Sequence, residues 1–494
     1  MGIGRRIDES VSTALRDGRF EAALCTLRRI QPQVSASGES ESCLVKAELL
    51  EHTGDWASAS TLIHQLREKA SLSAIQRSRC SVVEGLVASG CGHLADAAVA
   101  YRRACLEAES GRALEQTCWS QLRLMGVLAQ TGDADSVEDL RTQLRQDVAR
   151  LGAPSVSIAF QILSAETEAK RGETDRSCYH SDLADSLLIQ YPNIWLRGLL
   201  EIQRSCVHYL IGAFPNALHC AEAALESSKL SGHAATRTAA LANMAAAYLA
   251  LGQPARSNVC IFTALQNTGR QQQAHGLLLE TLAESRLAER KLEACETLLN
   301  EADVLASHLS QVRPGWYEWW NVRTKARLLQ RRQRWNESLD LLHATLQLGS
   351  CQKQSFASVQ LHVLSALAHS RVGDVASASR MTEALATMNG DGTLLFQGLL
   401  QNLFGVLRAH GGDTDSSIPL FARSLRMLAS GGEHGTQVEV VDSFLEQVDR
   451  GQWDRSSGTA NPESETLPRP NVVFTHLEAT TPIVNERAID CAET

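Results

Sequence analysis

Residues 240–252 read ALANMAAAYLALG, and this stretch contains the pattern that decides the fold. Its larger apolar residues Leu241, Met244 and Tyr248 recur every three or four positions, which is typical of one face of an α-helix. Gly252 then suits the left-handed conformation that commonly ends a helix. The stretch therefore predicts the first helix and the turn of a helical hairpin.

The same turn recurs eleven times along the chain, in steps of 36 to 43 residues and most often 40. Nine copies carry glycine in the turn slot and two carry another residue. The slots hold Gly18, Gly54, Gly92, Gly132, Gly172, Gly212, Gly252, Arg290, Gln333, Gly373 and Gly412. A near-constant step indicates one tandem array rather than separate domains. In such an array each hairpin contacts only its neighbours, so stability is expected to be a nearest-neighbour sum.

Small residues mark where the two helices of each hairpin cross. Seven positions before the turn slot the chain has Val11, Ala47, Gly85, Met125, Ala165, Ser205, Ala245, Ala283, Ala326, Ala366 and Gly405. Five positions after it the chain has Ala23, Ala59, Ala97, Val137, Ser177, Ala217, Ser257, Cys295, Ser338, Ala378 and Ser417. Antiparallel helices that cross closely need a residue without bulk on each partner. The two series therefore predict the contact point.

This pattern resembles the tetratricopeptide repeat family. Tyr248 and Gly252 stand at the offsets of that family, and Gly85 with Tyr101 and Ala104 matches in another copy. The resemblance covers roughly residues 5–450 and implies an all-α, right-handed superhelical solenoid of about eleven antiparallel helix hairpins. The 40-residue step exceeds the family's 34, so longer helices or loops are expected. An array of HEAT-like or other α-hairpins is the alternative.

Composition narrows the class of protein. Hydrophobic residues make up 44% and charged residues 21% of the 494, which argues against global disorder, and 5% aromatics argue against a β-sandwich. The net charge of −9 gives no general attraction to nucleic acid or acidic membranes. There is no apolar run long enough for a membrane span and no secretory signal. Thirteen scattered cysteines without a C-x-x-C pair predict reduced thiols. A bacterial cytoplasmic protein is expected.

Motifs for catalysis are missing from the sequence. There is no phosphate loop, no H-E-x-x-H, no G-x-S-x-G elbow and no G-x-G-x-x-G. We therefore expect no enzyme, no cofactor and no metal site.

The resemblance implies that the first helix of each repeat lines the concave surface. Positions ten, six and two before the turn slot would face it. In the ninth repeat these positions hold Arg323, Arg327 and Arg331, a ridge on one helix face, with Trp316 and Trp320 at the helix start. Guanidinium groups bind carboxylates and phosphates, and tryptophan adds stacking area. One interpretation of the ridge is a site for an anion or an acidic peptide, at which Arg327→Glu would abolish binding without unfolding the array.

An alternative interpretation of the ridge is structural. Glu280 and Glu284 occupy the matching positions of the preceding first helix, so the two rows could pair across adjacent helices. On the sixth first helix Leu199, Ile202, Cys206, Tyr209 and Leu210 form an apolar row. This row either seats an apolar side chain of a peptide or is buried within its hairpin.

After about residue 450 the composition changes. Residues 451–471 are rich in Ser, Thr, Pro, Glu and Gly, which predicts a disordered linker. Residues 472–494 form a short tail with a possible helix from Pro482 to Ala492, and 481–493 weakly resemble the segment before the phosphate loop of bacterial enhancer-binding activators. The sequence thus predicts a non-catalytic scaffold or adaptor that binds a protein or peptide in its groove. The alternative is a ligand-sensing module that regulates transcription or an effector enzyme.

Overall fold

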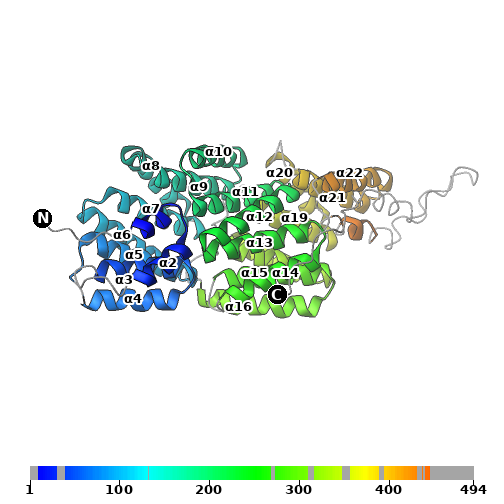
Figure 1. Ribbon diagram of the computed structural model, residues 1–494. Helices are drawn as coiled ribbons and strands as arrows, with labels where there is room; N and C mark the ends of the chain where they lie inside the picture. Colours follow the sequence, from blue (N-terminus) through cyan, green and yellow to red (C-terminus); the bar gives the residue numbers. More distant parts are fainter. Residues whose placement is uncertain are drawn as a thin grey trace, which may run out of the picture.

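The structure, a computed structural model, describes residues 9–30, 39–69, 71–131, 133–268, 273–309, 316–347, 356–388, 394–430, 437 and 440–445. These residues form the helices α1 to α22 and a further helical segment at 440–445, with no strand among them. The prediction of an all-α solenoid of eleven hairpins is confirmed. Figure 1 shows the helices side by side in one continuous array. The predicted linker at 451–471 and the tail at 472–494 lie outside the described residues.

Each hairpin consists of an odd-numbered first helix and an even-numbered second helix. The hairpins are α1 (Glu9–Arg16) and α2 (Phe20–Ile30), α3 (Glu39–His52) and α4 (Trp56–Lys69), α5 (Ala74–Gly90) and α6 (Leu94–Ser110), α7 (Leu114–Gln130) and α8 (Ala134–Leu151), α9 (Pro154–Lys170) and α10 (Thr174–Gln190), α11 (Ile194–Leu210) and α12 (Phe214–Ser231), α13 (Ala234–Ala250) and α14 (Pro254–Asn267), α15 (Gln273–Ala288) and α16 (Leu292–Leu309), α17 (Trp316–Arg331) and α18 (Trp335–Gln347), α19 (Phe356–Arg371) and α20 (Val375–Met388), and α21 (Leu394–His410) and α22 (Thr414–Ser430).

The turn slot is a left-handed position in every described turn. Eight glycines of the series have positive φ, for example 71° at Gly252. Arg290 and Gln333, the two exceptions in sequence, adopt φ of 58° and 61° at the same place. The residue after the slot then donates its N–H five residues back, as from Gln253 to the Tyr248 carbonyl at 2.8 Å. This bond completes a Schellman-type helix end.

The predicted helix crossings are observed. All residues of the two small-residue series are buried. The two glycines are buried, and each of the other residues is at most 1% exposed. Ser205 Oγ donates to the Ala217 carbonyl at 2.8 Å, and Ser177 Oγ donates to the Ala165 carbonyl at 2.7 Å, so each serine links the two crossing points of its hairpin. Most helices of the central repeats contain 17 or 18 residues. The extra length of the repeat therefore lies in the helices.

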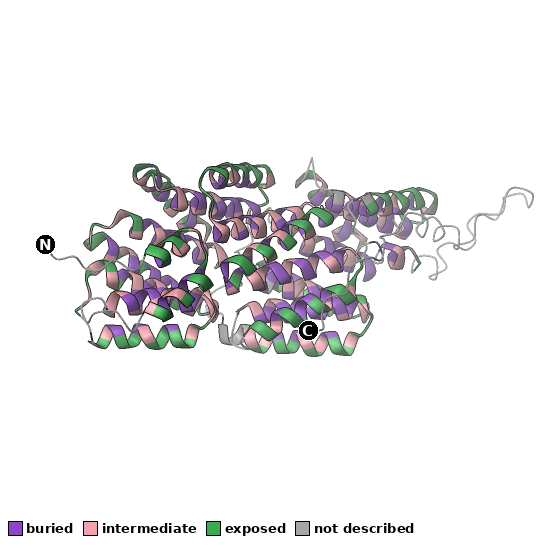
Figure 2. Ribbon diagram, in the orientation of Figure 1, coloured by how far each residue is buried: buried purple, intermediate pink, exposed green. Residues whose placement is uncertain are grey.

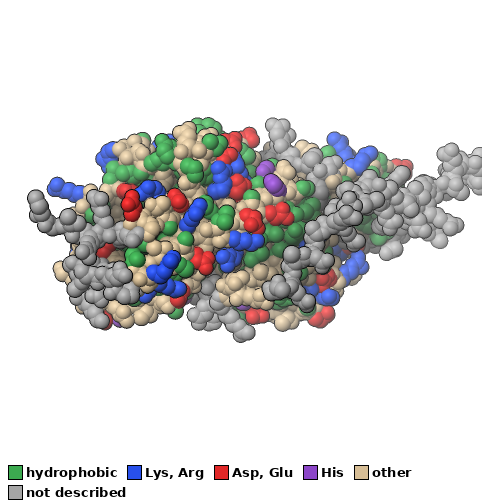
Figure 3. Space-filling view, in the orientation of Figure 1, with side chains coloured by type: hydrophobic (Ala, Val, Ile, Leu, Met, Phe, Trp, Pro, Cys, Tyr) green, Lys and Arg blue, Asp and Glu red, His purple; other side chains and the backbone are tan. Residues whose placement is uncertain are grey.

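Successive first helices form the inner layer of the array. Helices α5, α7, α9, α11, α13 and α15 each contact the next in this order. The second helices lie outside, and Figure 2 shows their exposed faces turned outward, for instance on α8 and α10. Figure 3 shows Lys and Arg interspersed with Asp and Glu on the viewed face. No described helix combines the length and apolarity that spanning a membrane requires.

The superhelix is wound so tightly that hairpins five repeats apart touch. At the first closure, the Ile194 N–H donates to the Asp17 carbonyl at 3.0 Å. Phe20 stacks on His52 with ring centroids 4.0 Å apart and meets the edge of Trp195 at 5.5 Å. Helix α2 contacts α12, and α5 contacts α15. Figure 1 shows α2 close to α12 and α13.

A second closure joins the sixth hairpin to the eleventh. Phe214, Leu395 and Phe421 belong to one buried cluster. These contacts correct the expectation that each hairpin meets only its neighbours. A superhelix with five hairpins per turn brings distant repeats together, so the stability of this array includes long-range contacts besides the nearest-neighbour interfaces.

Candidate binding cavity

One turn of the superhelix encloses a cavity of about 1310 Å³. Five consecutive first helices, α7 to α15, present the same positions to it. Positions ten and six before the turn slot line it in all five, as the sequence predicted: Leu122, Ile162, Ile202, Ala242 and Glu280, then Gly126, Glu166, Cys206, Ala246 and Glu284. The third predicted position, two before the slot, lines it only at Gln130, Lys170 and Leu210.

Two further positions line the cavity that the sequence interpretation missed. Thirteen before the slot are Trp119, Ala159, Leu199, Ala239 and Leu277, and nine before it are Arg123, Leu163, Gln203, Asn243 and Thr281. Both rows follow from helix geometry. Position thirteen lies three residues from position ten, and position nine lies three residues from position six, so each new row is on the same side of the helix as a predicted row. A wider face at each repeat would have found them.

The wall of the cavity is largely apolar. All five members of the row on α11, Leu199, Ile202, Cys206, Tyr209 and Leu210, line it. These side chains therefore face the cavity and do not contact only the other helix of their own hairpin. Burial raises the pKa of the Cys206 thiol to about 11, so this sulfur presents a neutral, weakly polar surface.

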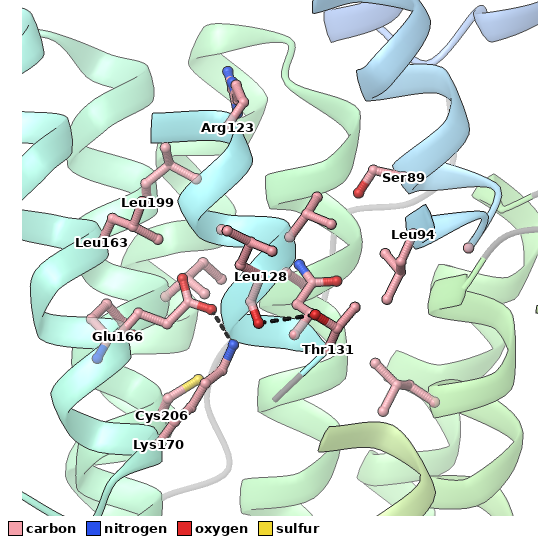
Figure 4. A pocket seen from close by; sticks show the side chains of 18 of the residues that line it. Ser89, Leu94, Arg123, Leu128, Thr131, Leu163, Glu166, Lys170, Leu199 and Cys206 are labelled. Atoms are coloured by element: carbon pink, nitrogen blue, oxygen red, sulfur yellow. Dashed lines mark hydrogen bonds and ion pairs between the residues drawn. The ribbon is translucent and has the colours of Figure 1, made fainter. Parts of the chain in front are cut away.

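Acidic groups of the wall are matched by partners. Lys170 Nζ donates to Glu166 Oε1 at 2.6 Å, and Figure 4 shows this pair projecting from α9. Thr324 Oγ1 donates to Glu280 Oε1 at 2.6 Å. Burial, reinforced by the neighbouring Glu284, raises the pKa of Glu280 to about 7. This carboxyl is therefore partly protonated near neutral pH.

The arginine ridge of α17 is engaged in ion pairs. Arg323 donates to Glu284 Oε1 at 2.8 Å, and Arg327 donates to the same oxygen. Burial opposes ionisation of Glu284, but the two guanidinium groups hold its pKa below the usual value. Arg331 pairs with Asp442, beyond the eleventh hairpin. The contacts of Arg323 and Arg327 are those of the structural interpretation, and none of the three arginines is part of the cavity lining.

Two of the three aromatic candidates from the sequence lie at the cavity. Tyr209 and Trp320 both line the cavity, with ring centroids 6.4 Å apart. The guanidinium carbon of Arg323 lies 5.3 Å from the Trp320 ring centroid, so the ridge supports one aromatic wall residue. Trp316 begins α17, but its side chain lies outside the described residues.

Within the part of the chain that the structure describes, no group of three or more His, Cys, Asp or Glu side chains is arranged to hold a metal ion. Burial raises the pKa of several thiols, to about 12 for Cys295, which keeps them protonated.

Comparisons with known proteins identify solved structures with a similar fold. No protein-family model and no curated protein sequence matches the chain. Among solved structures, a Rap protein complexed with Competence and Sporulation Factor is similar, at 11% identity, covering 80% of this chain and 99% of that one with a TM-score of 0.52. The fold is of the tetratricopeptide-repeat type. At such low identity the similarity concerns the fold alone.

Two other solved structures match with lower scores. NprR in complex with its cognate peptide NprX covers 80% of this chain and 99% of that one, at 9% identity and a TM-score of 0.49. The hetero-tetramer Cut9–Hcn1 covers 90% and 86%, at 10% identity and 0.45.

Proposed function

We propose that this protein is a non-catalytic scaffold or adaptor that binds a peptide, or an extended segment of a partner protein, in the concave cavity. The observation that carries the proposal is the cavity itself. Its volume of about 1310 Å³ exceeds the roughly 300–1,000 Å³ typical of small-molecule sites. Its wall repeats the same positions over five helices, and such a periodic surface suits an extended chain better than a compact ligand.

The chemistry of the wall supports a peptide ligand. Apolar side chains of α9 and α11 offer burial, while Gln203, Asn243 and Thr281 form a row of neutral polar groups at matching positions. Each of the three already donates a hydrogen bond within the protein, so their oxygens are the atoms that can accept from peptide N–H groups. In this proposal Tyr209 and Trp320 contact the partner directly. Arg323 and Arg327 shape the wall through Glu284.

The similar fold of the Rap protein, which was crystallised with Competence and Sporulation Factor, agrees with a binding role for an array of this kind. Nothing in the proposal requires catalysis, nucleic acid or a membrane, and we place the protein in the cytoplasm on the same grounds as the sequence expectation. Of the remaining sequence candidates, Arg331 pairs outside the cavity and Trp316 is not needed for the proposal.

A ligand-sensing module that regulates transcription or an effector enzyme is the second candidate. It is favoured by Trp195, which lines the cavity and also packs against Phe20 of the first closure. A ligand that displaces Trp195 would therefore act on the contact between the first and sixth hairpins. Binding inside the cavity would then change the shape of the array, which is what a sensor requires.

Filling the cavity tests the proposed function. Ala242 faces the cavity on α13, whereas Ala255 is exposed on the outer helix α14. Tagged wild-type protein, Ala242→Trp and Ala255→Trp are used to capture partners from native lysate, followed by mass spectrometry of proteins and of released small molecules. We expect one stoichiometric protein or peptide with the wild type and Ala255→Trp, and its loss with Ala242→Trp. Equal capture by all three would rule out the cavity as the site.

A further inference from the structure

Arg123 on α7 is a charged group of the cavity that has no ion-pair partner among the described residues. It lies nine positions before its turn slot and lines the cavity. Its guanidinium carbon sits 5.6 Å from the centroid of the Trp195 ring. Among the described residues, this guanidinium forms no ion pair and no side-chain hydrogen bond. Arg123 is half-buried, and none of its nitrogen atoms is fully buried without a partner, so its donors are open to a ligand in the cavity.

Other charged groups of the cavity differ from Arg123 in this respect. Glu166 pairs with Lys170, and Glu284 with the arginines of α17. Asp133 accepts from the Ser136 N–H at the start of α8. Asp96, Asp135 and Arg102 are exposed at the rim, where water solvates them. Among the described residues of the wall, no negatively charged group is therefore paired with Arg123.

A carboxyl of the protein itself lies near Arg123 but does not neutralise it. Glu51 on α3 is buried, and its Oε2 lies 3.2 Å from His52 Nδ1 without the geometry of a hydrogen bond. Burial raises the pKa of Glu51 to about 7, although the charge of Arg123 acts in the opposite direction. This carboxyl is therefore only partly ionised near neutral pH, and no ion pair joins it to Arg123, so the positive charge of Arg123 remains available to a ligand.

The surroundings of Arg123 are apolar. Figure 4 shows Arg123 at the end of the drawn side chains away from the Glu166–Lys170 pair, with Leu163 and Leu199 between them. The guanidinium lies over the Trp195 ring and makes no hydrogen bond with another side chain, so its N–H groups are available for bidentate hydrogen bonding to a carboxylate. A single cation at the end of an apolar wall selects a ligand with one negative group followed by apolar side chains.

We propose that Arg123 binds a carboxylate of the peptide that occupies the cavity, while apolar side chains next to that carboxylate pack on Leu163 and Leu199. This inference rests on the proposed function. It moves the anchor for an acidic group, which the sequence suggested on α17, to α7, five repeats earlier along the inner layer. The carboxylate comes either from an acidic side chain or from the peptide's own C-terminus.

The test uses fluorescein-labelled hexapeptide libraries, made once with free C-terminal carboxylates and once as C-terminal amides. Binding to the full chain is measured by fluorescence polarisation for wild type, Arg123→Gln and the control Arg145→Gln, which changes an exposed arginine on the outer helix α8 of the same hairpin. We expect the wild type to select peptides with a carboxylate at one position. Replacing that carboxylate by an amide, or replacing Arg123 by glutamine, should each weaken binding about 10- to 100-fold, the range for a charged hydrogen bond.

Combining both changes should cost no more than either one, because they remove the same contact. Arg145→Gln should leave the affinity within about twofold, since its side chain is exposed outside the cavity. If peptides bind but neutral and acidic ones bind equally, the role of Arg123 is wrong and the proposed function stands. This comparison needs only the wild type, so it holds even if Arg123→Gln unfolds. If no hexapeptide binds, the proposed function fails, and the inference fails with it.

Discussion

Replacing Gly232 by alanine tests whether the superhelix closes on itself in solution. Gly232 ends α12 with φ of 72°, and a Cβ added there would lie 2.5 Å from Glu21 Cβ and 3.0 Å from the Glu21 backbone nitrogen. Gly152 is a matched control: it ends α8 with φ of 64°, in the same type of helix end, and a Cβ there would meet nothing within 4 Å.

The two substitutions share one cost and differ in another. A left-handed alanine costs about 1–2 kcal/mol at either site. Only Gly232→Ala adds a steric clash with α2, which is typically about 1–3 kcal/mol because backbone must move. We therefore expect losses in the free energy of unfolding of about 1–2 kcal/mol for Gly152→Ala and about 2–5 kcal/mol for Gly232→Ala.

Urea unfolding of both variants measures these losses, and native-state hydrogen exchange locates them. Faster exchange of α2 amides in Gly232→Ala alone would show that the closure has opened. Small-angle scattering should then give a larger radius of gyration for that variant. Equal losses for the two variants, with unchanged exchange in α2, would refute the closure as a stabilising contact.

Two further predictions concern charge. Arg327→Glu adds a third carboxyl next to Glu280 and Glu284, so we expect the free energy of unfolding, measured in urea, to fall by about 3–5 kcal/mol. The sequence interpretation instead expected a folded variant that does not bind. An unfolding midpoint equal to that of the wild type would contradict the ion pair between Arg327 and Glu284. Burial lowers the pKa of His233 to about 3 and that of His52 well below 6.5, so the unfolded chain binds protons that the folded chain does not. The two histidines should therefore lower the stability as the pH drops from about 6.5 toward 3, by up to about 1.4 kcal/mol per pH unit for each. Glu51 and Glu280, each with its pKa raised to about 7, oppose this effect between pH 7 and 4.5, so the net fall should appear below about pH 4.5. Urea titrations at several pH values should show this fall, and His233→Gln should reduce it; a stability that stays constant between pH 4.5 and 3 would contradict the assignment.

The hairpins and the face that they turn inward could be predicted from the sequence. Turn slots at Arg290 and Gln333 keep the left-handed conformation of the glycines, so the step of the repeat is a stronger signal than the residue type. The small residues at the crossings and the positions ten and six before the turn behave as expected. Each of these features depends on contacts within one hairpin or between two consecutive ones, which lie within about one repeat of each other in the chain.

The role of individual charged side chains could not be predicted in this way. Arg323 and Arg123 are both arginines on inner helices, yet the first is bound by Glu284 and the second faces the cavity without an ion-pair partner among the described residues. The difference depends on which carboxylate lies across the neighbouring helix and at what distance. A repeat pattern describes positions and not the pairing of long, flexible side chains.

The periodic spacing of small, apolar and turn residues specifies the helices, their crossings and the order in which they stack. The closure of the array depends on the rotation from one hairpin to the next, which accumulates over five repeats before Phe20 meets Trp195. A change of a few degrees in the rotation between successive hairpins would separate these residues and open the cavity. Such a change would not alter the spacing of residues within a repeat. The cavity, with the half-buried Arg123 in its wall, therefore exists only because the full turn is completed in three dimensions.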